Sequence, residues 1–211
     1  MAKLTRIEEI NLILGIQGML EKAGSNENDN PWDSVEAKLQ ALGYLPEGTK
    51  CSEQEVKEAY LCLLAKLTDD ALAQSGRGKV VYQINSEALE QLRVAPDEDP
   101  DFYPDLIADL KKNMAAYAQI VLSFQLWREK WQHDLSGEDY RQKFGDLDQR
   151  RSRIHDHLRQ RLDLVNSEAR DQGLPLIIDV GESRVQEVNR TDVANAILIW
   201  YQEQVSQELH K

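Results

Sequence analysis

The sequence predicts a mainly α-helical bundle built on a long antiparallel helical hairpin, with one or two short β-strands. Three observations lead to this prediction. Apolar residues recur at spacings of three and four in several long segments, as in helices with one buried face. The longest such pattern follows Pro104, and another follows Gly145 after a polar segment. Residues of high β-propensity gather in short segments, of which 79–84 is the clearest in the N-terminal half.

The first helix of the hairpin is expected to run from Pro104 to about His133. Proline suits the first turn of a helix because its missing N–H would have no partner there, and Asp105 places a negative charge near the positive end of the helix dipole. A stripe of apolar residues follows on one side of this helix: Leu106, Leu110, Met114, Tyr117, Val121 and Phe124. The helix would be roughly 45 Å long, which is long for a small domain.

The second helix is expected to begin after Gly145 and to end before Gly173. The segment 135–139, between the two helices, contains the Ser, Gly and Asp residues that favour turns. The apolar face of the second helix consists of Leu147, Ile154, Leu158, Leu162 and Val165. Because Gly173 and Pro175 prevent the helix from continuing, the two helices can pack antiparallel.

Residues 1–95 are expected to form an N-terminal helical domain with a short strand, and residues 96–211 a C-terminal helical bundle. The boundary is placed at 96–104, where three prolines and four acidic residues interrupt regular structure. The helices expected before this boundary cover residues 4–20, a short segment capped by Asp33 or Ser34 and ending near Gly43, a longer segment after Ser52, and residues 86–92. Ser52 and Glu55 have the spacing of a capping box.

The C-terminal part contains one expected strand and one expected helix. The strand, at 174–178, is expected to pair with the segment around Val80. The helix, capped by Asn189 or Thr191, has apolar residues on two faces, which include Val193, Ile197, Trp200, Leu198, Tyr201 and Val205. A helix of this kind needs packing partners on both sides. It is therefore either central in the fold or the interface of a homodimer formed through residues 191–209.

The composition restricts the classes of partner. A net charge of −12 argues against nucleic acid and anionic membranes, which are bound through clustered Lys and Arg. No apolar run approaches the ~20 residues of a membrane span, and the first residues do not form a cleavable signal. Cys51 and Cys62 do not have the spacing of a metal site and do not imply an oxidising compartment. We expect an acidic, cytoplasmic protein without a cofactor.

The segment 148–161 is locally basic, and its chemistry has three interpretations. In the first, His155-Asp156 resembles the paired ligands of metal-dependent phosphohydrolases, with His133 and Asp179 as further ligands. Against this, His155 and His157 lie about 160° apart around a helix and cannot easily share one ion.

The second interpretation is a site for a small ligand or an anion. Its residues are Arg150, Arg151, His155 and Arg161. Arg151 and His155 are one helical turn apart, and a guanidinium can bind a phosphate or a carboxylate through two hydrogen bonds. This interpretation requires that Arg151 and His155 border an open pocket.

The third interpretation, which we prefer, is structural. The basic residues pair with acidic residues of the same region and lock the hairpin; the acidic residues are Asp146, Asp148, Asp156 and Asp163. Exposed ion pairs would stabilise the fold by only ~0–1 kcal/mol each, so their main effect would be on orientation.

A longer pattern extends from Leu147 to Trp200. It consists of Leu147-Asp-x-Arg150-Arg-x-x-x-His155, then Leu158, Leu162 and Asn166, then Gly173-Leu-Pro, and finally the closing apolar helix. This segment resembles an uncharacterised bacterial family of domains of unknown function. The resemblance implies a bacterial origin and a helical domain, and it implies no catalytic role.

Common catalytic motifs are absent from the sequence. It contains no phosphate-binding Gly-rich loop, no Gly-x-Ser-x-Gly and no His-Glu-x-x-His. The sequence therefore predicts a non-catalytic protein-interaction or regulatory protein that binds another protein or a second copy of itself. The alternative is a ligand-binding module, or a metal-dependent phosphohydrolase, that uses the region of Arg151, His155 and Asp156.

Overall fold

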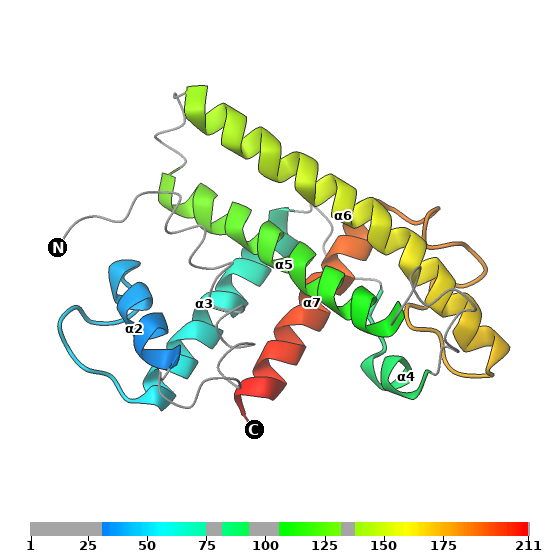
Figure 1. Ribbon diagram of the computed structural model, residues 1–211, viewed down its shortest axis with the longest axis horizontal. Coiled ribbons are helices and arrows are strands. Elements are labelled where there is room, and N and C mark those ends of the chain that lie inside the picture. Colours follow the sequence, from blue (N-terminus) through cyan, green and yellow to red (C-terminus); the bar gives the residue numbers. More distant parts are fainter. Residues whose placement is uncertain (1–30, 75–81, 93–105, 132–137, 211) are drawn as a thin grey trace.

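The computed structural model describes residues 31–74, 82–92, 106–131 and 138–210. Within these ranges the chain forms helices packed into a bundle, shown in Figure 1. The helices are α2 (Pro31–Ala41), α3 (Glu53–Gln74), α4 (Ser86–Gln91), α5 (Leu106–Trp131), α6 (Glu138–Asp171) and α7 (Arg190–Leu209). No strand occurs in the described ranges, and the prediction of a mainly helical protein is confirmed. The helix expected at 4–20 lies outside them.

The helices on either side of the predicted boundary at 96–104 share one core. Helix α3 packs against α2, α5 and α7. The buried cluster contains Leu39 and Leu63 from the first part of the chain and Leu110, Leu162 and Ile197 from the second. Residues 93–105 lie outside the described residues, so the boundary itself stays a prediction.

Helices α5 and α6 run antiparallel where they touch. Asp109, near the start of α5, lies beside His157 of α6, and the ring centroids of Tyr117 and His155 are 5.2 Å apart. Further along α5, the guanidinium of Arg151 lies 5.4 Å from the centre of the Phe124 ring. The connection at 132–137 lies outside the described residues, so the hairpin as a whole is not tested.

Helix α6 begins earlier than predicted. Gly145 lies inside α6, which starts at Glu138, so the expected start after Gly145 was wrong. One glycine costs a helix only about 1 kcal/mol relative to alanine. Once a helix has formed, each further residue adds a hydrogen bond, and the helix can continue through such a position.

Within the described residues, the predicted strands meet in a single contact. Ile84 and Ile178 form one isolated antiparallel bridge, and the N–H of Asn85 donates to the carbonyl of Ile177 over 2.7 Å. The described residues contain no ladder of strands. The pairing stops here because the side chain of Asn85 caps α4, which begins at the next residue. Residues 79–81 lie outside the described residues.

The capping residues predicted for α3 are confirmed, and of the two caps left open for α7, Asn189 or Thr191, the structure has Asn189. Glu55 accepts from the N–H of Ser52 at 2.7 Å, and Ser52 Oγ accepts from the N–H of Glu55 at 3.3 Å, which together form the capping box. Asn189 caps α7 by accepting from the N–H of Thr191 at 2.8 Å. The cap predicted for α2 was wrong, because Pro31 takes the first helical position and leaves Asp33 in the first turn.

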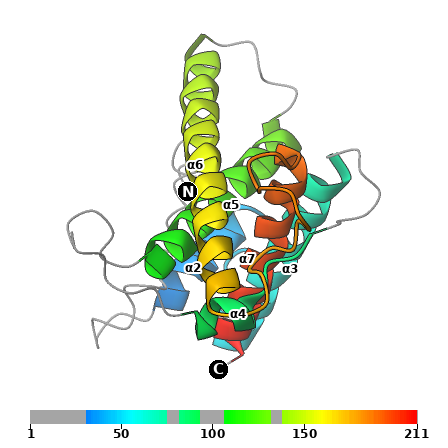
Figure 2. The same cartoon turned by 90° about the vertical axis from the view of Figure 1, so that its right-hand side faces the viewer.

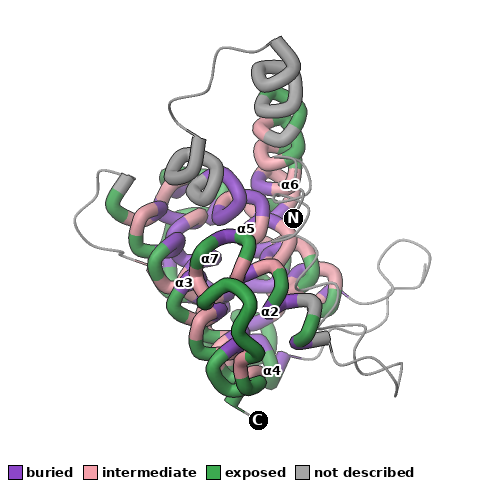
Figure 3. Tube along the Cα trace, turned by 90° about the vertical axis from the view of Figure 1, so that its left-hand side faces the viewer, coloured by how far each residue is buried: buried purple, intermediate pink, exposed green. Residues whose placement is uncertain are grey.

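Helix α7 lies in the centre of the fold. Most of its apolar residues, on both faces, are buried within the chain: Leu198 and Val205 are only 2% and 3% exposed, while Ala194, Ile199 and Leu209 are partly buried. Figure 3 shows buried positions in α7 and in its neighbours α3 and α5. The chain therefore covers both apolar faces itself, and the apolar pattern gives no support to a homodimer through residues 191–209.

Thr68 of α3 offers a test of the core. Its side chain is fully buried, and Oγ1 has no hydrogen-bond partner within the described residues. Because a buried, unpaired hydroxyl is unfavourable, Thr68→Val is expected to raise the free energy of unfolding by about 1 kcal/mol and the Tm by roughly 2–4 °C. Thermal unfolding of this variant beside Thr49→Val, a change at an exposed position, measures the difference. A lower Tm for Thr68→Val than for the parent protein would contradict the expectation.

Candidate functional site

The four residues of the predicted ligand site lie on α6 in four different environments. Arg150 is exposed, and Arg151 Nη2 lies 2.5 Å from Asp148 Oδ1. His155 is 4% exposed, and the side chain of Arg161 is 13% exposed. None of the four lines either of the two grooves described below. Neither groove therefore meets the requirement of the ligand interpretation, an open pocket bordered by Arg151 and His155.

His155 is a covered, neutral imidazole. Burial lowers its pKa from 6.5 to about 4, and the charges of Arg159 and Arg190 act in the same direction. The carboxylate of Asp156 and a hydrogen bond with the backbone of Arg190 oppose this shift. Burial also raises the pKa of the neighbouring Tyr117 to about 12. Both rings are therefore uncharged at neutral pH, and they pack together as core residues.

The residues of the metal interpretation are not assembled. Asp156, adjacent to His155, pairs with Arg190 at 2.6 Å. Among the described residues, no group of three or more His, Cys, Asp or Glu side chains is placed to hold a metal ion. His133, which that interpretation also requires, lies outside them. This arrangement gives the phosphohydrolase interpretation no geometric support.

Arg151 pairs with Asp148, as the structural interpretation expects, whereas other charged side chains of α6 have partners outside the predicted set. Arg161 Nε lies 3.4 Å from Asp109 Oδ2 of α5, and His157 Nε2 lies 3.3 Å from the same oxygen. Two predicted acidic partners reach beyond the hairpin, because Asp156 pairs with Arg190 and Asp163 lies 3.8 Å from Arg184. The charged residues of α6 therefore hold the segment that follows α6 as well as α5.

That segment, residues 172–189, is called the α6 loop. It returns along α6 in Figure 1. The side chain of Asn166 binds its first part. Asn166 Oδ1 accepts from the N–H of Ile177 at 2.9 Å and of Ile178 at 3.2 Å, while Nδ2 donates to the carbonyl of Ile178 at 2.9 Å. Asn166 is 2% exposed, so three buried backbone groups depend on one amide.

The second part of the α6 loop is held by Arg159 and Asp163. The guanidinium of Arg159 donates to the carbonyls of Val185 at 3.2 Å and Val188 at 2.7 Å, and also to that of Gln186. Asp163 Oδ1 accepts from the N–H of Val185 at 2.5 Å. A guanidinium suits this task because it presents several donors in one plane. Three side chains of α6 thus fix the loop along its length.

A groove of about 410 Å³ lies between α6 and its loop. The lining residues contributed by α6 include Gln160, Asp163, Leu164, Ser167 and Arg170, and those from the loop include Glu182 and Arg184. Leu164 is 46% exposed, and it alone among the residues of described exposure is an exposed large apolar side chain. The groove therefore combines one accessible apolar side chain with acidic and basic groups.

Arg150, Arg153 and Leu164 lie on the same outward side of α6. Their positions differ by three and eleven residues, which places them within about 60° of one another around a helix. All three are exposed. Figure 2 shows α6 at the front of the molecule. We call these three residues the outer face of α6.

The sequence interpretation missed the side chains that define this region. Arg153, Arg159 and Leu164 were not selected as functional residues, and Asn166 was noted only as part of a resemblance. The partners of Arg159 and Asn166 lie eleven or more residues away and are backbone groups. The position of a backbone group does not depend on residue type, so the sequence gives no direct signal for these bonds. The one available signal was Asn166 in an apolar helix face, followed by the Gly173-Leu-Pro turn that the helix could bind.

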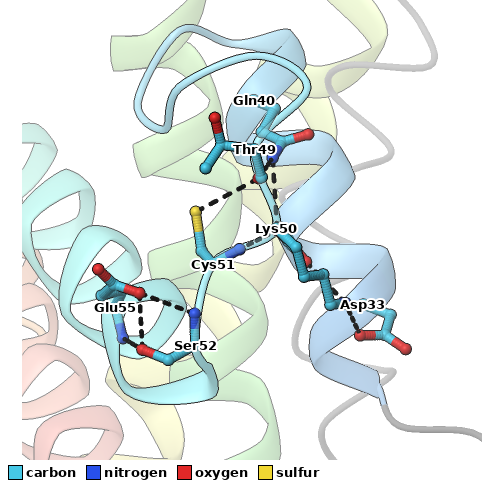
Figure 4. A network of polar contacts seen from close by, with 8 residues as sticks. Asp33, Gln40, Thr49, Lys50, Cys51, Ser52 and Glu55 are labelled. Atoms are coloured by element: carbon cyan, nitrogen blue, oxygen red, sulfur yellow. Dashed lines mark hydrogen bonds and ion pairs between the residues drawn. The ribbon is translucent and has the colours of Figure 1, made fainter.

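A second polar cluster joins α2 to the segment before α3 (Figure 4). Glu36 Oε1 accepts from the N–H of Cys51 at 2.6 Å, and Lys50 Nζ lies 3.0 Å from Glu36 Oε2 and 2.5 Å from Asp33. The bond from Cys51 and then the contact with Lys50 lower the pKa of Glu36. Burial and then the charges of Glu36 and Glu55 raise the pKa of the Cys51 thiol. A thiol held in its neutral form is a poor nucleophile.

The outer side of α7 carries another groove, of about 630 Å³. Its lining residues are Ile199, Gln202, Glu203, Ser206, Gln207 and His210. All except Ile199 are polar, which is ordinary for a solvated helix side. None of the described helices combines the length and the apolar character needed to cross a bilayer.

Comparison with known proteins adds no information on function. No family model, no curated protein and no solved structure matches the chain. The resemblance of residues 147–200 to a bacterial family of unknown function therefore stays an expectation from the sequence.

Proposed function

We propose that this chain is a non-catalytic protein-interaction module whose partner binds to the outer face of α6 and to the adjoining groove. The exposure of Leu164 is the observation that carries the proposal. A single exposed leucine is common on protein surfaces. This one lines a groove beside a loop that three side chains hold in place, and that setting distinguishes it.

The fixed loop favours binding. Arg159, Asp163 and Asn166 hold the α6 loop through hydrogen bonds to its backbone, so the groove exists before a partner arrives. A partner that binds a preformed groove does not have to order the loop, which would otherwise weaken the affinity. An apolar side chain of the partner would cover Leu164. The polar residues that line the groove would select the partner residues next to that apolar side chain.

A ligand-binding or phosphohydrolase site at Arg151, His155 and Asp156 has less support. His155 is covered, and Arg151 and Asp156 are paired with Asp148 and Arg190. A site for a small molecule or an ion requires accessible donors that converge on one point. Arg151 and Asp156 instead form ion pairs within the chain, and His155 is buried.

We infer further that α5 and α6 form the predicted hairpin and that the protein works in the cytoplasm. The antiparallel contacts of α5 with α6 support the hairpin. Cys51 and Cys62 are free thiols, which suits a reducing compartment. A homodimer would use the outer face of α6 rather than residues 191–209, most of whose apolar side chains are covered.

Site-specific photocrosslinking tests the proposed binding face. A photoreactive phenylalanine analogue at position 164, in protein expressed in the cell of origin, is expected to give a defined adduct with one protein partner. The same analogue at the exposed position Gln54 of α3 is expected to give none. Absence of an adduct specific to position 164 would contradict the proposal, while an adduct with a second copy would identify the protein as its own partner.

Binding of the identified protein, purified, then tests the role of Leu164. Leu164→Asp is expected to weaken this binding by about tenfold or more, because a buried apolar anchor at an interface contributes on the order of 2 kcal/mol. Gln54→Asp introduces the same charge elsewhere and is expected to leave the affinity unchanged. Equal affinities for Leu164→Asp and Gln54→Asp would show that the partner does not bind here.

A further inference from the structure

Two arginines on the outer face of α6 differ from the other arginines of the region. Arg151, Arg161, Arg184 and Arg190 lie beside carboxylates, and Arg159 and Arg170 donate to backbone carbonyls. Arg150 and Arg153, both exposed, form no hydrogen bond or ion pair with any part of the chain that the structure describes. Asp146, one turn before Arg150, is exposed as well. Within the described residues, no side chain or backbone group therefore occupies the two guanidiniums, and we treat them as available to an external acceptor.

The position of these arginines relative to Leu164 is fixed by the helix. Arg153 and Leu164 are separated by eleven residues, about three turns, and hence by roughly 16 Å along α6. Arg150 lies one turn further on. One elongated ligand that follows the helix can therefore contact both arginines at one end and Leu164 at the other.

The charge distribution favours an acidic ligand at this place. Residues 138–190 contain ten basic and eleven acidic residues, whereas the whole chain has a net charge of −12. The rest of the chain thus carries nearly all the negative charge and repels an acidic segment. Such a segment is steered toward the nearly neutral region, where free guanidiniums can bind carboxylates.

Building on the proposed function, we propose that the outer face of α6 binds an acidic peptide segment of a partner protein. Carboxylates of this segment contact Arg150 and Arg153, and an apolar side chain packs on Leu164. In an extended segment the acidic and apolar residues are about five residues apart, and in a helical segment about eleven. A peptide fits better than a nucleic acid, because two arginines beside an exposed leucine do not provide the many phosphate contacts on which nucleic-acid affinity depends.

A phage-displayed library of random peptides tests this specificity without knowledge of the natural partner. Selection on the full-length protein is expected to enrich peptides that have two or more Asp or Glu residues and an apolar residue at one of the two spacings. Selection on the double variant Arg150→Glu/Arg153→Glu is expected to lose the acidic preference. No enrichment, or an acidic preference that survives in the double variant, would overturn the proposal.

Fluorescence anisotropy with the most enriched peptide, labelled with fluorescein, measures the contribution of each residue. Arg150→Glu and Arg153→Glu are each expected to weaken binding by about tenfold, an effect that declines as salt increases. Lys112→Glu changes the net charge equally at an exposed position of α5 and is expected to change the affinity by less than about twofold. Equal effects of Lys112→Glu and the two arginine variants would show that only the overall charge matters.

The leucine variant separates failure of this inference from failure of the proposed function. If the partner trapped at position 164 loses affinity for Leu164→Asp but binds Arg150→Glu and Arg153→Glu normally, the interaction module stands and its acidic specificity is refuted. If Leu164→Asp also binds normally, both proposals are refuted. Tight binding of a labelled single-stranded oligonucleotide that depends on Arg150 and Arg153, without binding of the peptide, would likewise overturn the acidic-peptide proposal.

Discussion

Replacement of Asn166 with alanine is expected to lower the free energy of unfolding by about 3–5 kcal/mol. The amide of Asn166 binds the N–H of Ile177, the N–H of Ile178 and the carbonyl of Ile178, all of them buried. Alanine leaves these three buried groups without partners, because its methyl group can neither donate nor accept a hydrogen bond. Each buried group that loses its partner costs on the order of 1–3 kcal/mol, and partial relaxation of the loop recovers some of this.

Urea unfolding measures this effect, and Asn113→Ala provides the control. Asn113 is also a helical asparagine, but its amide bonds to Asp109 of the same helix, so its loss is expected to cost less than about 1 kcal/mol. For Asn166→Ala, the Tm is expected to fall by roughly 10 °C. If the two variants have the same unfolding midpoint within error, the role assigned to Asn166 is wrong.

Acidification is expected to destabilise the protein by about 3 kcal/mol through His155. Burial lowers the pKa of His155 from 6.5 to about 4 in the folded protein, whereas the unfolded chain keeps the ordinary value. As the pH falls below 6.5, the unfolded state therefore takes up a proton that the folded state does not, and the stability decreases until the pH reaches about 4. Above pH 6.5 the imidazole is neutral in both states and contributes no pH dependence.

The surroundings of His155 explain why the folded state resists protonation. The ring packs against Tyr117, and Nε2 is buried without a hydrogen-bond partner in the described residues. Arg159 and Arg190 repel an added positive charge, and Asp156 offsets only part of this repulsion. A protonated imidazole here would therefore be a partly uncompensated buried charge.

The phenylalanine variant isolates this contribution. His155→Phe keeps a ring against Tyr117 and removes the titratable imidazole. The free energy of unfolding of this variant is therefore expected to depend less steeply on pH between 6.5 and 4.5. Urea unfolding at several pH values measures the slope, and His210→Asn, a change at an exposed position, is expected to keep the slope of the parent protein. If His155→Phe keeps that slope too, His155 is not the residue responsible.

The helices that the sequence predicted correctly depend on local signals. The capping box of Ser52 and Glu55 and the cap at Asn189 involve residues at most three positions apart, so spacing identifies the first and narrows the second to Asn189 or Thr191. The apolar stripes of α5 and α7 are similarly local patterns with the period of a helix. Such patterns specify which face of a helix is buried, because burial of apolar area is the dominant stabilising term.

The errors arose where a signal depends on the surroundings. The second helix was expected to begin only after Gly145, but a continuing helix tolerates one glycine. The segment 174–178 was interpreted as a strand, but the side chain of Asn166 binds the backbone groups of Ile177 and Ile178, and one bridge remains. Neither segment contains a residue pattern that indicates the continuing helix or the bonds from Asn166.

The candidate site was only partly predictable for the same reason. The basic character of residues 148–161 is evident from the sequence, and so is the possibility that acidic residues nearby pair with them. The chain's fold assigns Arg159 to loop carbonyls and Arg161 to Asp109, and it leaves Arg150 and Arg153 exposed. Identical side chains on one helix thus acquire different roles.

By itself the sequence determined that the protein is mainly helical, how several helices begin and which of their faces are apolar, since periodicity and capping act within a few residues. The tertiary structure alone decided that α7 is covered on both faces, that α6 holds its following loop and that Leu164 stays exposed. These outcomes depend on which segments meet in space, and a contact between distant segments is a property of the packed chain rather than of either segment.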